Sequence, residues 1–360
     1  MLRVVVHTPD VVGERMAGPG IRAWHLADEL SKHFDVALVA RLEGKPPARV
    51  PFPLLARGTP QAKRALHDAD VLVGQPARGF RRARKAQRIV YDLFDPVLLE
   101  LRVMYGHAPS LRQRVHLAAE KSRLKTALKE GDLLMVATPK QQELYRRSSI
   151  VVPFGAEPAE SRELTAESLI LWGGGTWEWL DPKTAVEAVV KLNRAGVPCR
   201  LLFLGRSRPN RSMVDRRRED RFDRLVASGE PFVQANDEWV PYRERLSWLH
   251  RAKIAIMLHR QTVEAEYSIR TRLFDAIAAA VPVITTEEGF AAELVRAEGL
   301  GVVVPPGDVD AVHEAMRRLL CDDAFHARCV TNLARIRPRF AWDVVTQPLI
   351  DAIQRWKHDD

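Results

Sequence analysis

The chain has 360 residues, of which 46% are hydrophobic and 28% charged, and its formal net charge is +9. This length allows two domains, and no stretch reaches the ~18 apolar residues of a membrane-spanning helix. The first residues, MLRVVVHTPD, lack the features of a signal peptide. Three scattered cysteines suit a reducing compartment. We therefore expect a cytoplasmic protein whose basic surface attracts anions.

The first part of the chain alternates short apolar runs with helical patterns, which predicts parallel α/β architecture. Strands are expected at 2–8, 36–40, 70–74, 88–92, 133–137 and 149–154. Helices are expected at 21–34 and 111–130, where apolar residues recur at helical spacing.

Two loops of this part could bind a ligand. Gly18 and Gly20 precede the helix expected at 21–34, where backbone amides can receive an anion. A tight turn explains such glycines equally well. Asp92 ends the strand at 88–92 and Asp95 follows it, so either could bind an acceptor hydroxyl or take a proton. Asp95 could instead cap a helix before Pro96.

The stretch FGAEPAESRELTAE at 154–167 has no periodicity, which indicates a linker. A second alternating series follows, with strands expected at 169–175, 199–205, 231–235, 253–259, 281–286 and 301–306. Helices are expected at 182–194, 241–250, 270–280, 289–297 and 308–320. A last helix at 342–356 could fold back on the first domain.

Two strand-to-helix loops of the second series could face a phosphate. Residues 173–175 are three glycines, Gly173, Gly174 and Gly175, and allow a ligand close to the backbone. The neighbouring Trp177 and Trp179 could stack on that ligand or only fill the domain. Arg206 follows the strand at 199–205, where it could reach a phosphate.

Five charged residues surround a helix start expected near Ser268: Glu264, Glu266, Arg270, Arg272 and Asp275. The amides and dipole of a helix start suit a diphosphate, and arginines add charge-assisted hydrogen bonds. A carboxylate one turn further could accept bonds from the vicinal diol of a ribose. The alternative is that these charges only pair with one another on the surface.

No nucleophilic triad, hydrolase carboxylate pair, zinc spacing or Walker-type loop is present in the sequence. We therefore expect neither a metal nor a cofactor.

The segments GPGIRAWHLADEL, YDLFDP, VVPFG, LWGGGTWEWLDP, SIRTRLFDAIAAAVPVITT and GVVVPPGD occur in this order. Together they resemble the bacterial branch of glycosyltransferase family 4 that carries WGGG/WLDP and FRTR-like motifs. The resemblance implies the GT-B fold, in which two Rossmann-like, doubly wound domains face a central cleft and the C-terminal helix crosses back. It implies an acceptor-binding domain at 1–155, completed by 340–360, and a nucleotide-sugar-binding domain at 156–339.

The resemblance also implies roles for single residues. Asp275 matches the acid that contacts the ribose, and Glu264 matches the acid that reaches the donor sugar. The glycines at 173–175 match the loop beneath the phosphates. The segment whose amides hold the diphosphate comprises Ser268, Ile269, Arg270 and Thr271.

Two departures from the family pattern leave alternatives open. The spacing of the acid pair differs and the pair ends in aspartate, so Glu264 and Glu266 both remain candidates for the donor contact. The basic residues that usually follow the first strand of the second domain are replaced by GGTWEWLDPK. Arg206, Arg270 or Arg272 must then neutralise the diphosphate.

The function implied is retaining, metal-independent transfer of a sugar from a nucleoside-diphosphate sugar to a hydroxyl acceptor. The acceptor would be a glycan, a lipid-linked molecule or a small molecule, in polysaccharide or glycoside biosynthesis. The candidate catalytic residues are Glu264, Arg270 and Asp92. The basic stretch RGFRRARKAQR at 78–88 could give peripheral contact with anionic lipid.

Two alternatives remain: a sugar-nucleotide epimerase of the same fold, and a basic nucleic-acid-binding protein. The second lacks a recognised reader motif and aromatic residues interleaved with basic ones, so no specific nucleic acid is expected as a partner.

Overall fold

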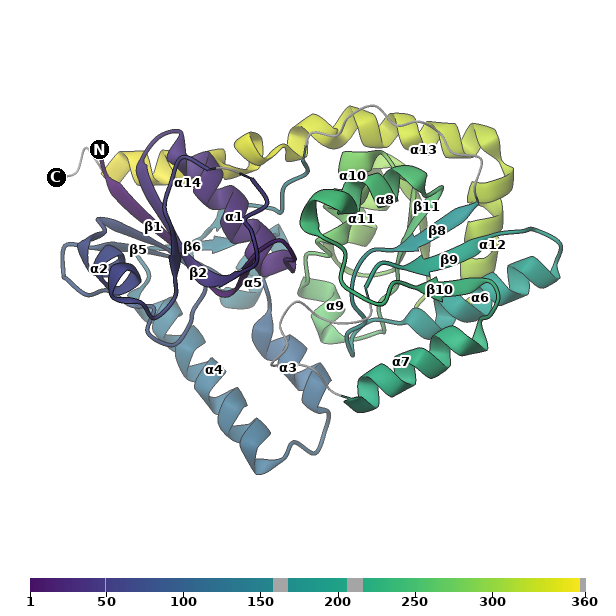
Figure 1. Ribbon diagram of the computed structural model, residues 1–360, viewed down its shortest axis with the longest axis horizontal. Helices are drawn as coiled ribbons and strands as arrows, with labels where there is room; N and C mark the ends of the chain where they lie inside the picture. Colours follow the sequence, from purple (N-terminus) through teal and green to yellow (C-terminus); the bar gives the residue numbers. More distant parts are fainter. Residues whose placement is uncertain (49, 158–167, 206–215, 357–360) are drawn as a thin grey trace. The chain divides into compact units, whose positions relative to one another are not determined.

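The computed structural model describes residues 1–48, 50–157, 168–205 and 216–356 (Figure 1). The chain divides into two compact units. The first comprises Met1–Gly155 with Phe340–Asp360, and the second comprises Ala156–Arg339. Both are built on parallel sheets with helices, which confirms the expected α/β class.

The first unit holds, within its described residues, a seven-stranded sheet of order β3-β2-β1-β4-β5-β6-β7. The strands are β1 Arg3–Gly13, β2 Asp35–Glu43, β3 Leu54–Ala56, β4 Val71–Gly74, β5 Arg88–Asp92, β6 Leu133–Val136 and β7 Ile150–Val151. Central strands such as β4 are buried on both faces, as runs of valine and leucine in a parallel sheet require. The partly exposed β3 has only three residues and was not expected.

The helices of this unit are α1 Gly18–Ser31, α2 Pro60–Asp68, α3 Val97–Tyr105, α4 Leu111–Glu130, α5 Pro139–Tyr145 and α14 Trp342–Trp356. The side chains of Thr59, Ser110 and Thr138 accept a hydrogen bond at the starts of α2, α4 and α5. Three of these helices, α2, α3 and α5, are too short to show a clear period and were not expected.

The loop expected after residue 8 is largely strand. β1 continues to Gly13 because, after a register shift, Val11 to Gly13 pair with residues 41–43 of β2. α1 then begins at Gly18, three residues earlier than expected. A Cβ on Gly20 would overlap the carbonyl oxygen of Val11, so this glycine is needed for close packing of α1 on β1.

The C-terminal helix α14 belongs to the first unit and packs against α1 (Figure 1). The ring of Trp342 stacks on His25, with 4.5 Å between ring centroids, and meets Phe154 edge-on at 5.1 Å. A Cβ on Gly155 would overlap that tryptophan ring. Gly155, the last residue of the N-terminal part of this unit, thus makes room for α14.

The second unit carries, among its described residues, a six-stranded parallel sheet of order β10-β9-β8-β11-β12-β13. The strands are β8 Leu169–Trp172, β9 Arg200–Phe203, β10 Val233–Ala235, β11 Ile254–Met257, β12 Val283–Thr286 and β13 Gly301–Val304. The chain winds outward from β8 in one direction and then from β11 in the other. This is the doubly wound order, and its switch point lies between β8 and β11.

The helices of the second unit are α6 Pro182–Arg194, α7 Arg216–Ser228, α8 Arg245–Arg251, α9 Val263–Tyr267, α10 Arg272–Ala279, α11 Gly289–Glu298, α12 Val309–Cys321 and α13 Asp323–Ile336. Asp181 caps α6 and Pro182 opens it. The helix expected at 241–250 divides into a 3₁₀ turn, Tyr242–Glu244, and α8. The five-residue α9 was not expected.

Candidate active site

The site is built where the second sheet reverses its winding direction. In open parallel sheets, ligands bind outside the carboxyl ends of the strands at this point. The loops that leave β8 and β11 here contain, respectively, the three glycines at 173–175 and the charged segment 258–271. The topology therefore brings together two motifs that lie about 90 residues apart in the sequence.

The guanidinium of Arg272 lies on the glycine loop. A Cβ on Gly174 would overlap its Nη1 atom, and a Cβ on Gly173 would lie 3.8 Å from it. Gly174 also has a φ of 110°, which side-chain-bearing residues rarely adopt. The backbone conformation therefore requires glycine at 174, and the guanidinium of Arg272 occupies the space that a side chain there would take.

Arg272 is partly buried and makes no hydrogen bond or ion pair within the described part of the chain. Burial lowers its pKa to about 10, against the opposing effect of Asp275, so the guanidinium is charged at neutral pH. It is a cation beside the glycine loop, available to an anion.

Arg270 is used differently. Its Nη1 donates to Thr285 Oγ1 at 2.5 Å and to the carbonyl oxygen of Thr286 at 2.7 Å. Its Nη2 donates to the carbonyl oxygens of Glu287 and Glu288 at 3.2 and 3.1 Å. The side chain is buried and holds the turn from β12 into α11, where Glu288 has a φ of 74°. This geometry favours a structural role for Arg270 and is not the surface pairing considered as an alternative.

Glu264 is a buried carboxylate without a full set of partners. It lies on α9, which Thr262 caps, and only 1% of its surface is exposed. Its Oε2 and the hydroxyl of Ser268 have no hydrogen-bond partner among the described residues. Burial raises the pKa of Glu264 to about 7, although the charge of Arg270 and the nearby hydroxyl of Ser268 oppose this. Glu266 is half-exposed, so the geometry favours Glu264 as the inward-facing acid.

The segment before α10 contributes backbone groups. The amide of Ser268 donates to the carbonyl oxygen of Glu264 at 2.9 Å and is not free for a ligand. For the amides of Ile269, Arg270 and Thr271, the described part of the chain offers no backbone acceptor. Because α10 begins at Arg272, these amides add to the positive end of its dipole.

Asp275 lies in the first turn of α10. Its Oδ1 accepts a hydrogen bond of 3.0 Å from Nε of Arg245, on α8. The carboxylate remains 26% exposed.

His259 belongs to the same region and was not predicted as a site residue. It is buried directly after β11, and its Nδ1 has no partner among the described residues. Burial, Arg270 and Arg272 lower its pKa well below the ordinary value, so the ring is neutral. Its sequence signal is weak, because a lone histidine at the end of an apolar strand is more often a core residue. Arg245 was also missed, because a single arginine in a basic chain does not stand out in the sequence.

Asp92 is not open to a ligand in the first unit. Its Oδ2 accepts from Arg22 Nε at 2.7 Å and its Oδ1 from Arg22 Nη2 at 3.1 Å. Arg22 also donates to the carbonyl oxygens of Val152 and Pro153. Both carboxylate oxygens are thus engaged in a buried ion pair, which favours a structural role.

The positions of the other expected site residues do not indicate a ligand contact. Asp95 is partly buried, and α3 starts from Pro96 without a side-chain cap, so the capping alternative is wrong. Gly18 lies in the first turn of α1. Arg206 lies outside the described residues. Trp177 and Trp179 stack with ring centroids 5.2 Å apart, and Trp179 is buried, which favours packing for that residue.

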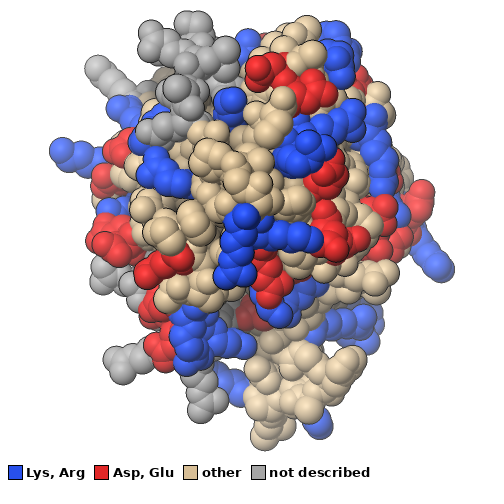
Figure 2. Space-filling view, turned by 90° about the vertical axis from the view of Figure 1, so that its right-hand side faces the viewer, with Lys and Arg blue, Asp and Glu red and all other residues tan. Residues whose placement is uncertain are grey.

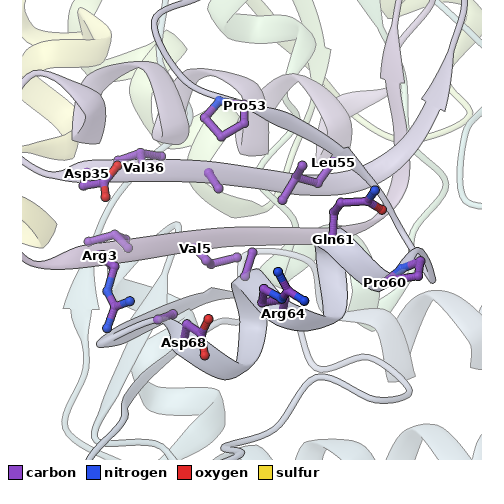
Figure 3. Close-up of a pocket in the computed structure, with 14 residues that line it drawn as sticks. Arg3, Val5, Asp35, Val36, Pro53, Leu55, Pro60, Gln61, Arg64 and Asp68 are labelled. Atoms are coloured by element: carbon purple, nitrogen blue, oxygen red, sulfur yellow. The ribbon is translucent and has the colours of Figure 1, made fainter.

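A cavity of about 440 Å³ lies in the first unit between α2 and the starts of β1 and β2 (Figure 3). Its floor is apolar, and Arg3, Asp35, Arg64 and Asp68 surround it. Because these are the amino ends of the strands, the cavity lies at the opposite edge from where parallel sheets bind their ligands. We do not assign it to the active site.

The surface charge is mixed. On the face in Figure 2, lysine and arginine side chains are interspersed with aspartate and glutamate. In the basic stretch 78–88, Arg82 pairs with Asp132 at 2.7 Å, and Arg84 donates to three carbonyl oxygens at the end of α2. These arginines therefore hold the local fold as well as contributing charge.

The described residues contain neither a membrane-spanning helix nor a cluster of metal ligands. No helix in those ranges is long and apolar enough to cross a membrane. Over the same residues, no group of three or more histidine, cysteine, aspartate or glutamate side chains is placed to hold a metal.

Comparison with known protein families finds a match in the second unit. Residues 167–322 match the family described as "Glycosyl transferases group 1". No curated protein matches the chain.

Solved structures match over the whole chain. Sucrose-phosphate synthase from Thermosynechococcus elongatus has a TM-score of 0.68 at 16% identity, over 100% of both chains. WaaG, a glycosyltransferase involved in lipopolysaccharide biosynthesis, has a TM-score of 0.69 at 17% sequence identity, over 98% of this chain and 99% of the WaaG chain. HepE from Anabaena, in complex with UDP and glucose, has a TM-score of 0.68 at 12% sequence identity, over 98% of this chain and 100% of the HepE chain.

At these identities the structural likeness establishes the fold, and the fold is GT-B. The family match covers most of the second unit, including the switch-point site. Together they confirm the prediction that the chain is a glycosyltransferase enzyme.

Proposed function

We propose that the protein is a retaining, metal-independent glycosyltransferase of family 4. Its second unit binds a nucleoside-diphosphate sugar, and a hydroxyl acceptor takes the sugar. The observation that carries this proposal is the charged Arg272 on the glycine loop at the switch point, which has no partner among the described residues. The HepE structure, which contains UDP and glucose, supports this choice of donor class.

The donor diphosphate would lie between the glycine loop and the start of α10. Arg272 and the amides of residues 269–271 would donate to it. The leaving diphosphate gains negative charge in the transition state, so donors fixed in advance lower the barrier. Loss of one such donor typically costs about 3 kcal/mol, or roughly 100-fold in rate.

The donor sugar and the ribose would meet the two acids of the site. The Oε2 atom of Glu264 would accept a hydrogen bond from a sugar hydroxyl, and Ser268 and the neutral His259 add nearby polar groups. Asp275 would accept from the ribose. The acceptor hydroxyl would attack the sugar directly, so no protein side chain would act as a nucleophile. In this type of transfer the leaving phosphate assists removal of the acceptor proton.

The acceptor is assigned to the first unit, on the side of Asp95 and the start of α1. We propose a glycan, a lipid-linked molecule or a small molecule as acceptor, in polysaccharide or glycoside biosynthesis. Within 78–88, Arg78, Arg81 and Lys85 are exposed and could contact anionic lipid at the cytoplasmic membrane face.

Calorimetry tests the donor site directly. UDP, GDP, ADP, CDP and dTDP are titrated into the wild type, Arg272→Ala and, as a control, Arg317→Ala, which removes a surface ion pair with Glu314. One diphosphate should bind the wild type and the control equally, and Arg272→Ala at least tenfold more weakly. Absence of binding to the wild type, or equal binding to all three proteins, contradicts the proposal.

Product analysis separates the remaining alternatives. With the matching nucleotide sugar, transfer should need an acceptor and keep the anomeric configuration. Release of an epimer without any acceptor would identify an epimerase. Tight, salt-sensitive binding of a random oligonucleotide, with no nucleotide-sugar binding, would identify a nucleic-acid binder.

A further inference from the structure

Arg245, at the start of α8, joins two carboxylates of the second unit. Its Nε donates to Asp275 Oδ1 at 3.0 Å, and its Nη2 donates to Glu157 Oε1 at 2.8 Å. Its Nη1 donates to the carbonyl oxygen of Tyr242 at 2.8 Å. The guanidinium carbon also lies 3.7 Å from the centroid of the Tyr242 ring. Only 13% of the side chain is exposed, so these contacts fix its conformation.

The contact with Arg245 leaves part of Asp275 free. A carboxylate has two oxygens and about four sites that can accept hydrogen bonds, and Arg245 occupies one of them. Asp275 remains 26% exposed. Because α8 and α10 are separate elements, Arg245 fixes the direction of a carboxylate that could otherwise rotate about its own side-chain bonds.

The first turn of α10 carries two opposite charges, those of Arg272 and Asp275. One guanidinium faces the carboxylates of both Asp275 and Glu157, so it does not serve Asp275 alone. A carboxylate oxygen accepts hydrogen bonds from hydroxyl groups and repels phosphate. Arg272 and Asp275 are three residues apart on one helix, roughly 5–6 Å between Cβ atoms. One helix start thus presents a cation for phosphates and an anion for a neighbouring diol.

We propose that Arg245 is a positioning residue for the nucleotide ribose. It orients the Asp275 carboxylate toward the 2′- and 3′-hydroxyls and thereby sets the preference for ribonucleotides over 2′-deoxyribonucleotides. This inference rests on the proposed function, because it requires a nucleoside diphosphate beside α10.

Paired titrations of ribo- and deoxyribonucleotides test this role. UDP and dUDP, GDP and dGDP, ADP and dADP, and CDP and dCDP are titrated into the full chain. The wild type should bind the ribonucleotide of one pair at least tenfold more tightly, as expected for a hydrogen bond to a charged group. Asp275→Asn should bring the ratio of the two affinities close to one.

The decisive variant is Arg245→Met, which keeps the packed stem of the side chain and removes its donors. It should lower the affinity for the ribonucleotide by fivefold or more and leave that for the deoxyribonucleotide unchanged. Glu157→Gln is the matched control, because it weakens the other carboxylate contact of Arg245 and should keep the wild-type ratio. If Arg245→Met does not fold, Arg245→Lys replaces it, and its ratio should also fall because one ammonium serves the two carboxylates poorly.

The outcomes separate the two proposals. An equal loss of both affinities, or an unchanged ratio, in the folded Arg245 variant would mean that the arginine is only structural. This would overturn the inference, while a lost preference in Asp275→Asn would still support the donor site. If no pair binds the wild type but dTDP does, this inference fails and the proposed function stands. If dTDP does not bind either, the proposed function fails as well.

Discussion

At the scale of single residues, the sequence presented Arg270 and Arg272 as equivalent cations, and the structure separates them. Arg270 donates to the backbone of the turn after β12, whereas Arg272 lies on Gly174 and has no partner in the described part of the chain. Two residues apart in this irregular segment, the side chains point to different surroundings. Which of them can meet a ligand depends on what packs around each, and the sequence does not contain that information.

Glu264 offers a test at the same scale through pH. Its pKa of about 7 in the folded protein lies above its ordinary value of 4.5. Between these values the folded state holds a proton that the unfolded state has lost, so stability falls as pH rises through this range. The free energy of unfolding falls by on the order of 3 kcal/mol over this range. In Glu264→Gln this contribution is absent.

Urea unfolding of the wild type and Glu264→Gln at pH 5 and pH 8 measures this effect. The variant should gain stability relative to the wild type between the two pH values. A difference that is the same at pH 5 and pH 8 would show that Glu264 titrates normally.

At the scale of elements, the buried pair of Arg22 and Asp92 connects α1, β5 and the segment after β7. Asp92→Asn would leave the guanidinium buried without its counter-ion, which typically costs about 3–5 kcal/mol. A double-mutant cycle with Arg22→Met, measured by thermal unfolding, should show strong coupling. Unchanged stability of Asp92→Asn combined with lost transfer would instead restore the catalytic role predicted from the sequence.

Strands with a continuous apolar run were predictable, whereas several elements without one were not, among them the 14-residue helix α13. The strands β4, β5, β8 and β11 are buried valine, isoleucine and leucine runs, which show regardless of context. In contrast, α9 has five residues and β3 has three, too few for a period to emerge. The extension of β1 to Gly13 depends on β2 as its partner, so its own sequence resembled a loop.

At the scale of the whole molecule, α14 comes from the far end of the chain and completes the first unit. Trp342 is only 5% exposed and packs on His25, Phe154 and Gly155. Trp342→Ala should therefore destabilise the first unit by about 3–5 kcal/mol. Val344→Ala, on the same helix at a position that is 50% exposed, is the control and should have little effect.

Hydrogen exchange locates the effect of Trp342→Ala. Exchange should accelerate in α1 and residues 150–155, while the strands β8 to β13 keep their wild-type rates. Uniform acceleration across the chain would contradict an assignment of α14 to the first unit alone.

The sequence by itself determined that the protein is α/β with two strand-rich halves, because buried parallel strands need continuous apolar runs whatever surrounds them. Its motifs also pointed to a glycosyltransferase. Only the tertiary structure decided that Arg272 lies on the glycine loop, that Glu264 is buried without a full set of partners, and that Arg245 holds Asp275. These are contacts between segments distant in the sequence. Burial and pairing, which set their charge and availability, exist only once the chain has folded.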